Sequence, residues 1–569
     1  MRSSNVSPGF DERWLLLPIS VLLLQLGFLF PLLWKASFFL LHSAGIGSYS
    51  PVATSLWRLK DGVSELLRTL TFSAASAFLQ TSLGFAVALF FAGSDPDRLT
   101  RWLSLLLLPA LVGDVAVGFV YKDLPVWIPS LQQRGTFHTW AALVIVQTWQ
   151  FLPMCIYLFL LRSLTIRGNM KDFSRISGLS RVENVRHVVW PHCRNLAFVL
   201  ALFAFLQGVA EFSKTDIMFG ASSGTKTEMM SHWIDTHEHQ LGENFPSQAQ
   251  DLALAYGGIL LATTLVSSVG VSALIILVIG QTLKGLARIM QTVRQRTGPP
   301  VEGVAVETSG ATRMRWIVGV TAIAVAVLPF GELVYDLVGR QTRVGLDTLA
   351  NGVSAVASGL PAVLLAAVSI AGVTIACGVI LRLLAPRLTE KFDEKSLPMF
   401  SGILLLHAAP GVALAYCALH WFHVLVADPA LIPLYWLLGE SILGLSVIGA
   451  FILYVHFDVP SAEIAFYRSS GASVREAFRE GFWSRFRLSY LLVGLFAFSI
   501  VISEDAISSV LYNFVPTVIV RLRPLASGRG SDYPQAAVIV LLTIALILVL
   551  ITLWNGVLVR SNIARKVEN

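Results

Sequence analysis

The side chains best suited to metal chemistry in this sequence lie in one short segment, HWIDTHEH, at residues 232–239. Histidine and aspartate are ligand types that can hold a transition metal. A polar loop that contacts another protein has the same composition, and we interpret the segment as such a loop, with no metal site in the chain. The residues concerned are His232, Asp235, His237 and His239.

A second segment, GASSGTKT at residues 220–227, comes close to a phosphate-binding loop. Such a loop needs a glycine directly before its lysine, and Thr225 stands at that position. The sequence also lacks the HExxH pattern of metalloproteases. We therefore expect no catalytic residues, no enzyme activity and no cofactor bound to this chain.

The composition explains why so few residues are available for chemistry. The chain has 569 residues, of which 55% are hydrophobic and 14% charged, and its mean hydropathy is +0.69. A helix that crosses the ~30 Å hydrocarbon core needs about 20 mostly apolar residues. We therefore predict an all-α, polytopic membrane protein with twelve spans, near residues 15–40, 67–92, 101–120, 138–162, 196–212, 255–280, 314–336, 359–383, 398–422, 434–455, 489–511 and 536–558.

Charge sets the expected orientation, because segments rich in lysine and arginine stay in the cytoplasm. With an even number of spans, most of these residues lie on the side that holds both termini, so we expect both termini to be cytoplasmic. This asymmetry accounts for the net charge of +7 without a nucleic-acid partner. The four cysteines are scattered, which indicates neither a disulfide framework nor a metal knuckle.

Two charged segments of the chain resemble each other. GLSRVENVRHVVWPHCRNLAFVLALFAF begins at Gly178 and GASVREAFREGFWSRFRLSYLLVGLFAF at Gly471, so the offset is 471 − 178 = 293, and ten of the 28 positions are identical. Earlier, Gly113 aligns with Gly411 at an offset of 298. We predict two homologous, parallel halves of six spans each, at residues 1–290 and 313–569, joined by a cytoplasmic linker at 291–312.

Each charged segment belongs to a long cytoplasmic loop between the fourth and fifth spans of its half, at residues 165–194 and 457–487. Ahead of the glycine, MKDFSRIS and EIAFYRSS alternate charged and apolar side chains, which predicts a short helix with one docking face. The glycine permits a left-handed turn. A second short amphipathic helix then leads back to the membrane.

These loops resemble the EAA loop of the permease subunits of ATP-binding-cassette importers, whose pattern is Glu-Ala-Ala, three residues, Gly, and later Ile-x-Leu-Pro. Neither copy keeps the literal Glu-Ala-Ala, and the second lacks the final proline. In addition, GVAEFSKT at residues 208–215 is similar to a stretch of the fused permeases for ferric iron, thiamine and phosphonates. The residues that the resemblance assigns to the loops are Asp172, Phe173, Ser174, Gly178, Leu179, Arg181 and Pro191 in the first copy and Ala465, Phe466, Tyr467, Gly471 and Ala472 in the second.

The resemblance implies a type I importer permease in the bacterial cytoplasmic membrane. Each loop would dock on one of two ATPase subunits, which bind ATP and magnesium, and an external binding protein would deliver the solute. ATP-driven closure of those subunits would switch the spans between inward-facing and outward-facing states. The resemblance leaves the identity of the solute open.

Acidic residues inside spans are costly and usually face a cavity or a partner. Glu211 and Glu504 recur at the offset of 293, and Asp505 follows the second. They are candidates for a gate or a solute path, or alternatively helix-end carboxylates that reach water or pair with Lys214. The single residues Asp114, His407 and Glu440 are further candidates for the path.

A secondary transporter with twelve spans is the alternative interpretation. It would also have two six-span repeats, but it does not need matched docking loops in both halves, and it more often has buried ion-coupling charges.

Overall fold

The described part of the chain is helical throughout. The structure is a computed structural model, and no strand occurs among the residues that it describes. Those residues are 12–43, 59–91, 108–122, 136–164, 181–211, 214–219, 234, 246–297, 321, 324, 327–331, 333–335, 337, 345–384, 409, 411–425, 428–456, 461–504, 506–511, 515, 517–527 and 533–568.

Seven helices within these ranges are long and apolar enough to cross a membrane. Their many exposed leucine, valine and isoleucine side chains suit contact with lipid. The expectation of an all-α, multi-pass membrane protein is therefore confirmed. The apolar stretches are Leu16–Ser37, Val63–Phe91, Trp140–Leu160, Val182–Val209, Ala253–Thr292, Leu346–Leu384 and Tyr533–Leu553. The helices that carry them are α1 (Leu16–Ser43), α3 (Leu59–Phe91), α9 (Thr136–Leu164), α12 (Trp190–Val209) with the short helical elements just before it, α15 (Pro246–Thr297), α17 (Leu346–Leu384) and α26 (Tyr533–Glu568).

Three further expected spans coincide with helices whose apolar stretches are shorter. These helices are α19 (Gly411–Leu425), α20 (Ile432–His456) and α23 (Ser484–Ser503). The expected run at 314–336 lies largely outside the described residues. The count of twelve spans thus stays a prediction.

The expected span at 101–120 is not one continuous helix where the structure describes it. It consists of α5 (Leu108–Leu111) and α6 (Asp114–Val120). Between them Gly113 has an extended backbone, with φ −65° and ψ 159°, and precedes the first turn of α6. Pro109 and Gly113 both weaken a continuous helix, so the chain breaks there.

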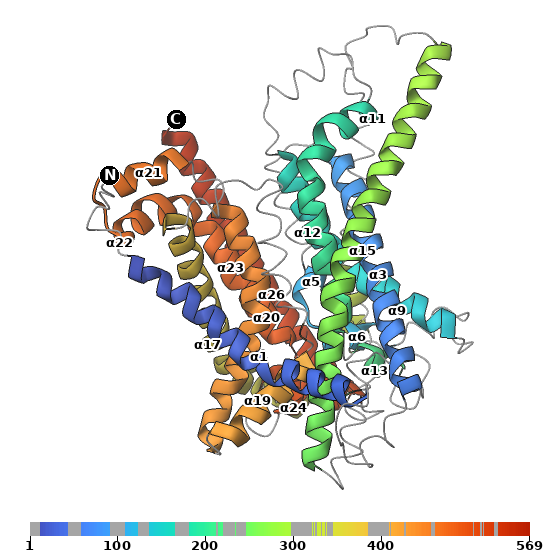
Figure 1. Ribbon diagram of the computed structural model, residues 1–569, viewed down its shortest axis with the longest axis vertical. Helices are drawn as coiled ribbons and strands as arrows, with labels where there is room; N and C mark the ends of the chain where they lie inside the picture. Colours follow the sequence, from blue (N-terminus) through green and yellow to red (C-terminus); the bar gives the residue numbers. More distant parts are fainter. Residues whose placement is uncertain are drawn as a thin grey trace.

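Helix α15 is much longer than the span predicted inside it. Its 52 residues correspond to about 78 Å at 1.5 Å per residue, well beyond the hydrocarbon core. The helix runs the full height of the molecule in Figure 1. It also continues to Thr297, so the linker expected from residue 291 begins at least seven residues later; the rest of that linker lies outside the described residues.

The helices form two groups that interlock. In Figure 1, α17, α20, α23 and α26 stand together, and α3, α9, α12 and α15 form the other group. Helix α1 packs on α15 but also on α17, α19 and α20 of the other group. The indole of Trp421 in α19 donates to the carbonyl of Phe28 in α1 (3.2 Å). Two further hydrogen bonds join the groups: Ser499 donates to the Leu111 carbonyl (2.9 Å) and Lys122 to the Ala526 carbonyl (2.8 Å).

The elements around the two charged segments have matching boundaries. Helix α11 (Arg181–Asn184) corresponds at the offset of 293 to α22 (Val474–Ala477). Each is followed by a π-helix, η2 (Val185–Val189) and η7 (Phe478–Trp483), and then by α12 or α23. Pro191 lies just after the first π-helix, and the equivalent residue after the second is Ser484. Because both copies have a π-helix and only one has the proline, proline alone does not cause the π-helical turn.

Candidate functional site

The second charged loop has the helix–turn–helix form that its sequence predicts. Helix α21 (Ser461–Ser469) ends in a turn in which the Ser470 amide donates to the Phe466 carbonyl (2.9 Å). Gly471 follows with φ +74°. This left-handed conformation is accessible to glycine and costly for residues with a Cβ atom. The left-handed glycine turn predicted in the second copy is confirmed.

A reciprocal cap starts the second helix of this loop. The Ser473 hydroxyl accepts from the Glu476 amide (3.2 Å), and the Glu476 carboxylate accepts from the Ser473 amide (2.7 Å). These hydrogen bonds hold the pKa of Glu476 below its usual value, because they favour the ionised carboxylate. The cap therefore fixes the direction in which α22 leaves the glycine turn.

Helix α21 has apolar side chains on two faces, one of which packs against the protein while the other is exposed. Ile464 is buried, whereas Phe466 is 64% exposed and Ala465 is also exposed. The ring of Tyr467 covers Gly481, where an added Cβ would lie 2.8 Å from it. Ala472 is half-buried behind the turn. The loop thus offers an exposed aromatic side chain on a helix that the protein holds in place.

Most of the corresponding residues in the first loop lie outside the described part of the chain: Asp172, Phe173, Ser174, Gly178 and Leu179. Arg181 begins α11, and Pro191 is the second residue of α12. Glu183 of α11 is buried and accepts from Gln291 near the end of α15 (2.9 Å). The long extension of α15 therefore supports the first loop, which no sequence pattern had indicated.

Replacing Gly471 by alanine is expected to strain the turn by about 1–2 kcal/mol, since a Cβ atom disfavours the left-handed conformation. Hydrogen exchange of the α21 and α22 amides should then become roughly 5–30 times faster. Gly471→Asn should behave nearly as the unaltered chain, because asparagine tolerates this conformation. Gly494→Ala is the control, because a Cβ at Gly494 meets no atom within 4 Å. Equal exchange in Gly471→Ala and Gly494→Ala would show that the turn does not depend on glycine.

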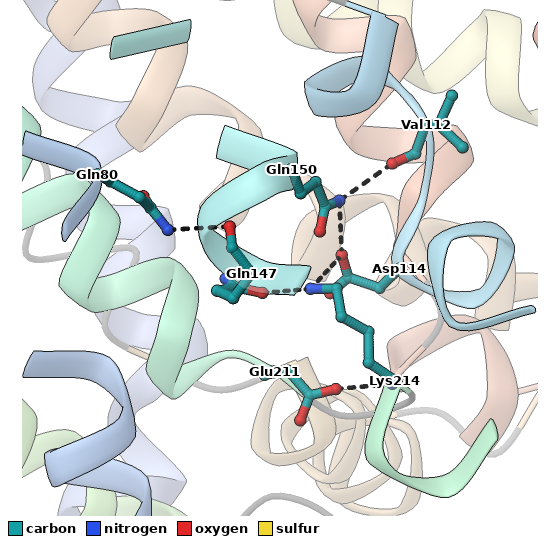
Figure 2. A network of polar contacts seen from close by, with 7 residues as sticks. All are labelled: Gln80, Val112, Asp114, Gln147, Gln150, Glu211 and Lys214. Carbon is teal, nitrogen blue, oxygen red and sulfur yellow. Dashed lines mark hydrogen bonds and ion pairs between the residues drawn. The ribbon is translucent and has the colours of Figure 1, made fainter. Parts of the chain in front are cut away.

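A buried polar cluster lies inside the first group of helices (Figure 2). The Lys214 ammonium pairs with Asp114 Oδ1 (2.9 Å) and donates to Gln147 Oε1. Gln150 donates to the same Asp114 oxygen (3.0 Å), and Gln80 donates to the Gln147 carbonyl (3.0 Å). Lys214 is fully buried. The ammonium belongs to α13 (Lys214–Phe219), and two other helices, α6 and α9, supply the groups that compensate its charge.

Asp114 was expected as a single residue along a solute path, and the structure brings it to Lys214. The two glutamines of α9 were missed, although their spacing of three residues in an apolar helix places them on one face. Gln150 also donates to the Val112 carbonyl at the break between α5 and α6 (3.1 Å). The cluster therefore ties the broken helix to α9.

Glu211 and Glu504 have the same local role in the two groups of helices. Glu211 Oε1 accepts from the Lys214 amide (2.6 Å), and Glu504 Oε1 accepts from the Ile507 amide (2.7 Å), each three residues further along. Both carboxylates thus satisfy backbone amides at the start of the short helices α13 and α24 (Ala506–Val510). The same hydrogen-bonding role thus recurs at the offset of 293, and a place for either residue at a gate or solute path stays a prediction.

Glu440 lies beside Glu504 in the second group. It is fully buried in α20, and no N–H or O–H of the described residues donates to either of its carboxyl oxygens. The Glu504 carboxyl is within hydrogen-bonding reach. Asp505 and His407 lie outside the described residues, as do the histidine-containing segment 232–239, apart from Ile234, and the segment 220–227. Among the described residues, no group of three metal-ligand side chains comes together.

Comparisons of the chain with protein families, with curated proteins and with solved structures found no match. The arrangement described above therefore has to be interpreted from its own geometry.

Proposed function

We propose that this chain is the membrane-spanning permease of an ATP-binding-cassette importer. It moves a small solute, delivered by an external binding protein, by alternating access. ATP is hydrolysed on two separate ATPase subunits, each held by one of the two charged loops. The chain itself carries out no catalysis and needs no cofactor of its own.

The observation that carries this proposal is the form of the second loop. A helix, a left-handed glycine turn and a capped second helix stand where the resemblance places a coupling loop, and Phe466 is exposed there as a large apolar contact. In Figure 1, α11 of the first loop lies at the same end of the molecule as α21 and α22. Two docking loops on one face suit a pair of ATPase subunits.

The matched elements support a second part of the proposal, namely that the two halves are homologous and each has six spans. Boundaries of α11 and α22 agree residue for residue at an offset of 293, and both are followed by a π-helix. The Glu211 and Glu504 hydrogen bonds agree at the same offset. A shared origin explains such agreement better than chance does.

The experiment is co-purification of the full chain from its native membrane, followed by ATPase measurement in lipid. The chain should bring down a soluble ATPase, and Phe466→Asp should lower the amount recovered by at least about tenfold, because an apolar anchor at an interface is worth about 2 kcal/mol or more. Leu425→Asp is the control, since Leu425 is 60% exposed and belongs to α19. In Figure 1 this helix lies toward the other end of the molecule from α21 and α22. Recovery of no ATPase with the unaltered chain would contradict the proposal.

A secondary transporter remains the second candidate function, and the Glu440–Glu504 pair is the observation that favours it. Buried carboxyl groups in membrane proteins commonly act in proton or ion coupling. In that case a proton or ion gradient alone, without ATP, would drive solute uptake into vesicles that contain the purified chain. Uptake that requires both ATP and an ATPase subunit would exclude it.

A further inference from the structure

The two groups of helices differ in charge at equivalent positions. At the offset of 293, Gln147 corresponds to Glu440 (147 + 293 = 440) and Lys214 to Ile507 (214 + 293 = 507). The first site holds its own cation, the Lys214 ammonium, paired with Asp114. The second site also has two carboxyl groups, Glu440 and Glu504, but it has isoleucine where the first site has its lysine. Its negative charge has to be compensated in another way.

Glu440 cannot remain a bare carboxylate without a large cost. It is fully buried within an apolar helix, and in the described part of the chain neither of its oxygens has a hydrogen-bond partner. The nearby indole of Trp436 donates instead to the Ser508 hydroxyl (3.3 Å). An unpaired ion in such surroundings is strongly disfavoured relative to its neutral form. The neutral form of Glu440 is also a hydrogen-bond donor.

Glu504 has the opposite surroundings. Its carboxylate accepts from the amides of Ile507 (2.7 Å) and Ser508 (3.2 Å). The absence of a side chain at Gly411 leaves room for it, since a Cβ there would lie 2.8 Å from Glu504 Oε1. Donors to a carboxylate favour its ionised form. Glu504 is therefore suited to accept a hydrogen bond as a carboxylate, whereas Glu440 favours its protonated form.

In the described part of the chain, no cation pairs with Glu440. Helices α1, α17, α19, α23 and α24 pack against α20. Asp347 and Arg382 lie near opposite ends of α17, and His420 and His423 lie in the second half of α19. Lys35 lies in the second half of α1, and Arg485 and Arg487 lie at the start of α23. The charged group that acts on Glu440 from these elements is Glu504.

We propose that Glu440 and Glu504 form a proton-binding site, in which a single proton is bonded to Glu440 and hydrogen-bonded to Glu504. The pair then carries one negative charge, which the two backbone amides of α24 stabilise. This inference does not rest on the proposed function, because it concerns the ionisation of the chain in either kind of transporter.

The test is infrared spectroscopy of the full purified chain in lipid at about pH 7, where an ordinary glutamate is ionised. The difference spectrum between the unaltered chain and Glu440→Gln should contain the C=O stretching band of one protonated carboxyl group, which shifts in D₂O. Glu463→Gln, on the exposed loop helix α21, is the control and should not remove this band. Glutamine at 440 can still donate to Glu504, so this variant should keep its thermal stability.

A second variant tests whether Glu440 is protonated because the second site has no lysine. Ile507→Lys supplies the cation that the first site has, so the band should disappear because both carboxyl groups can then ionise. If this variant does not fold, Glu440→Gln remains decisive. A difference spectrum without a protonated carboxyl band would overturn the proposal. So would a band that is present in choline buffer and lost when sodium or potassium is added, because the pair would then bind a metal cation.

Discussion

Replacing Lys214 by methionine is expected to lower the free energy of unfolding by about 3–5 kcal/mol, because it leaves the Asp114 carboxylate without its buried partner. The Lys214 side chain is 1% exposed and that of Asp114 23% exposed, and the two groups are 2.9 Å apart. Methionine keeps the length and apolar stem of lysine and removes the charge. Unfolding in lipid–detergent micelles with increasing sodium dodecyl sulfate would measure the change.

The double variant Lys214→Met with Asp114→Asn should recover much of the lost stability, since it removes both charges. Lys35→Met is the matched control. Lys35 pairs with Asp251 at 2.6 Å, but the two side chains are 23% and 38% exposed. An exposed pair of this kind contributes about 0–1 kcal/mol. If Lys214→Met and Lys35→Met cost the same, the buried cluster does not stabilise the fold as described.

Substitution of Gly258 by leucine is expected to separate α15 from α1 and to cost about 3 kcal/mol or more. A Cβ at Gly258 would collide with the Leu32 carbonyl oxygen and lie 2.6 Å from Ala36 Cβ. The neighbouring Gly257 faces Ala413 of α19, where a Cβ would lie 2.5 Å from the alanine Cβ. Small residues allow helices in a membrane to approach this closely. The thermal stability of the purified chain in lipid would show the loss.

Gly270→Leu on the same helix is the control for helix propensity and hydrophobicity. A Cβ at Gly270 meets nothing within 4 Å, and the residue is exposed on the lipid-facing surface. Leucine there should be neutral or slightly stabilising, because it is a better helix former than glycine. Similar losses for Gly258→Leu and Gly270→Leu would mean that the effect comes from the helix itself and not from its contact with α1.

The helical, membrane-spanning character of the chain could be predicted because length and hydrophobicity are local properties of a sequence. The turn at Gly471 could be predicted for the same reason, since a glycine between two amphipathic segments favours it. Repetition at a fixed offset pointed to the two loops. All these features are properties of short stretches of sequence.

The contents of the buried clusters could not be predicted in the same way. The pairing of Lys214 with Asp114 depends on how α6, α9 and α13 approach one another, and no stretch of sequence contains that information. Gln147 and Gln150 could not be singled out by charge, because a glutamine in an apolar helix is uncharged. The length of α15 was underestimated because hydrophobicity ends before the helix does.

The packing of α1 on α19 also bears on how the chain is made. Trp421 and Phe28, which form a hydrogen bond, are 393 residues apart in the sequence. At roughly 5–20 residues per second, α1 is synthesised about 20–80 s before its partner exists. Throughout that time lipid has to cover the surface that α19 later takes. Helix α1 is mostly apolar, so lipid can solvate its side chains as well as protein does until α19 is made.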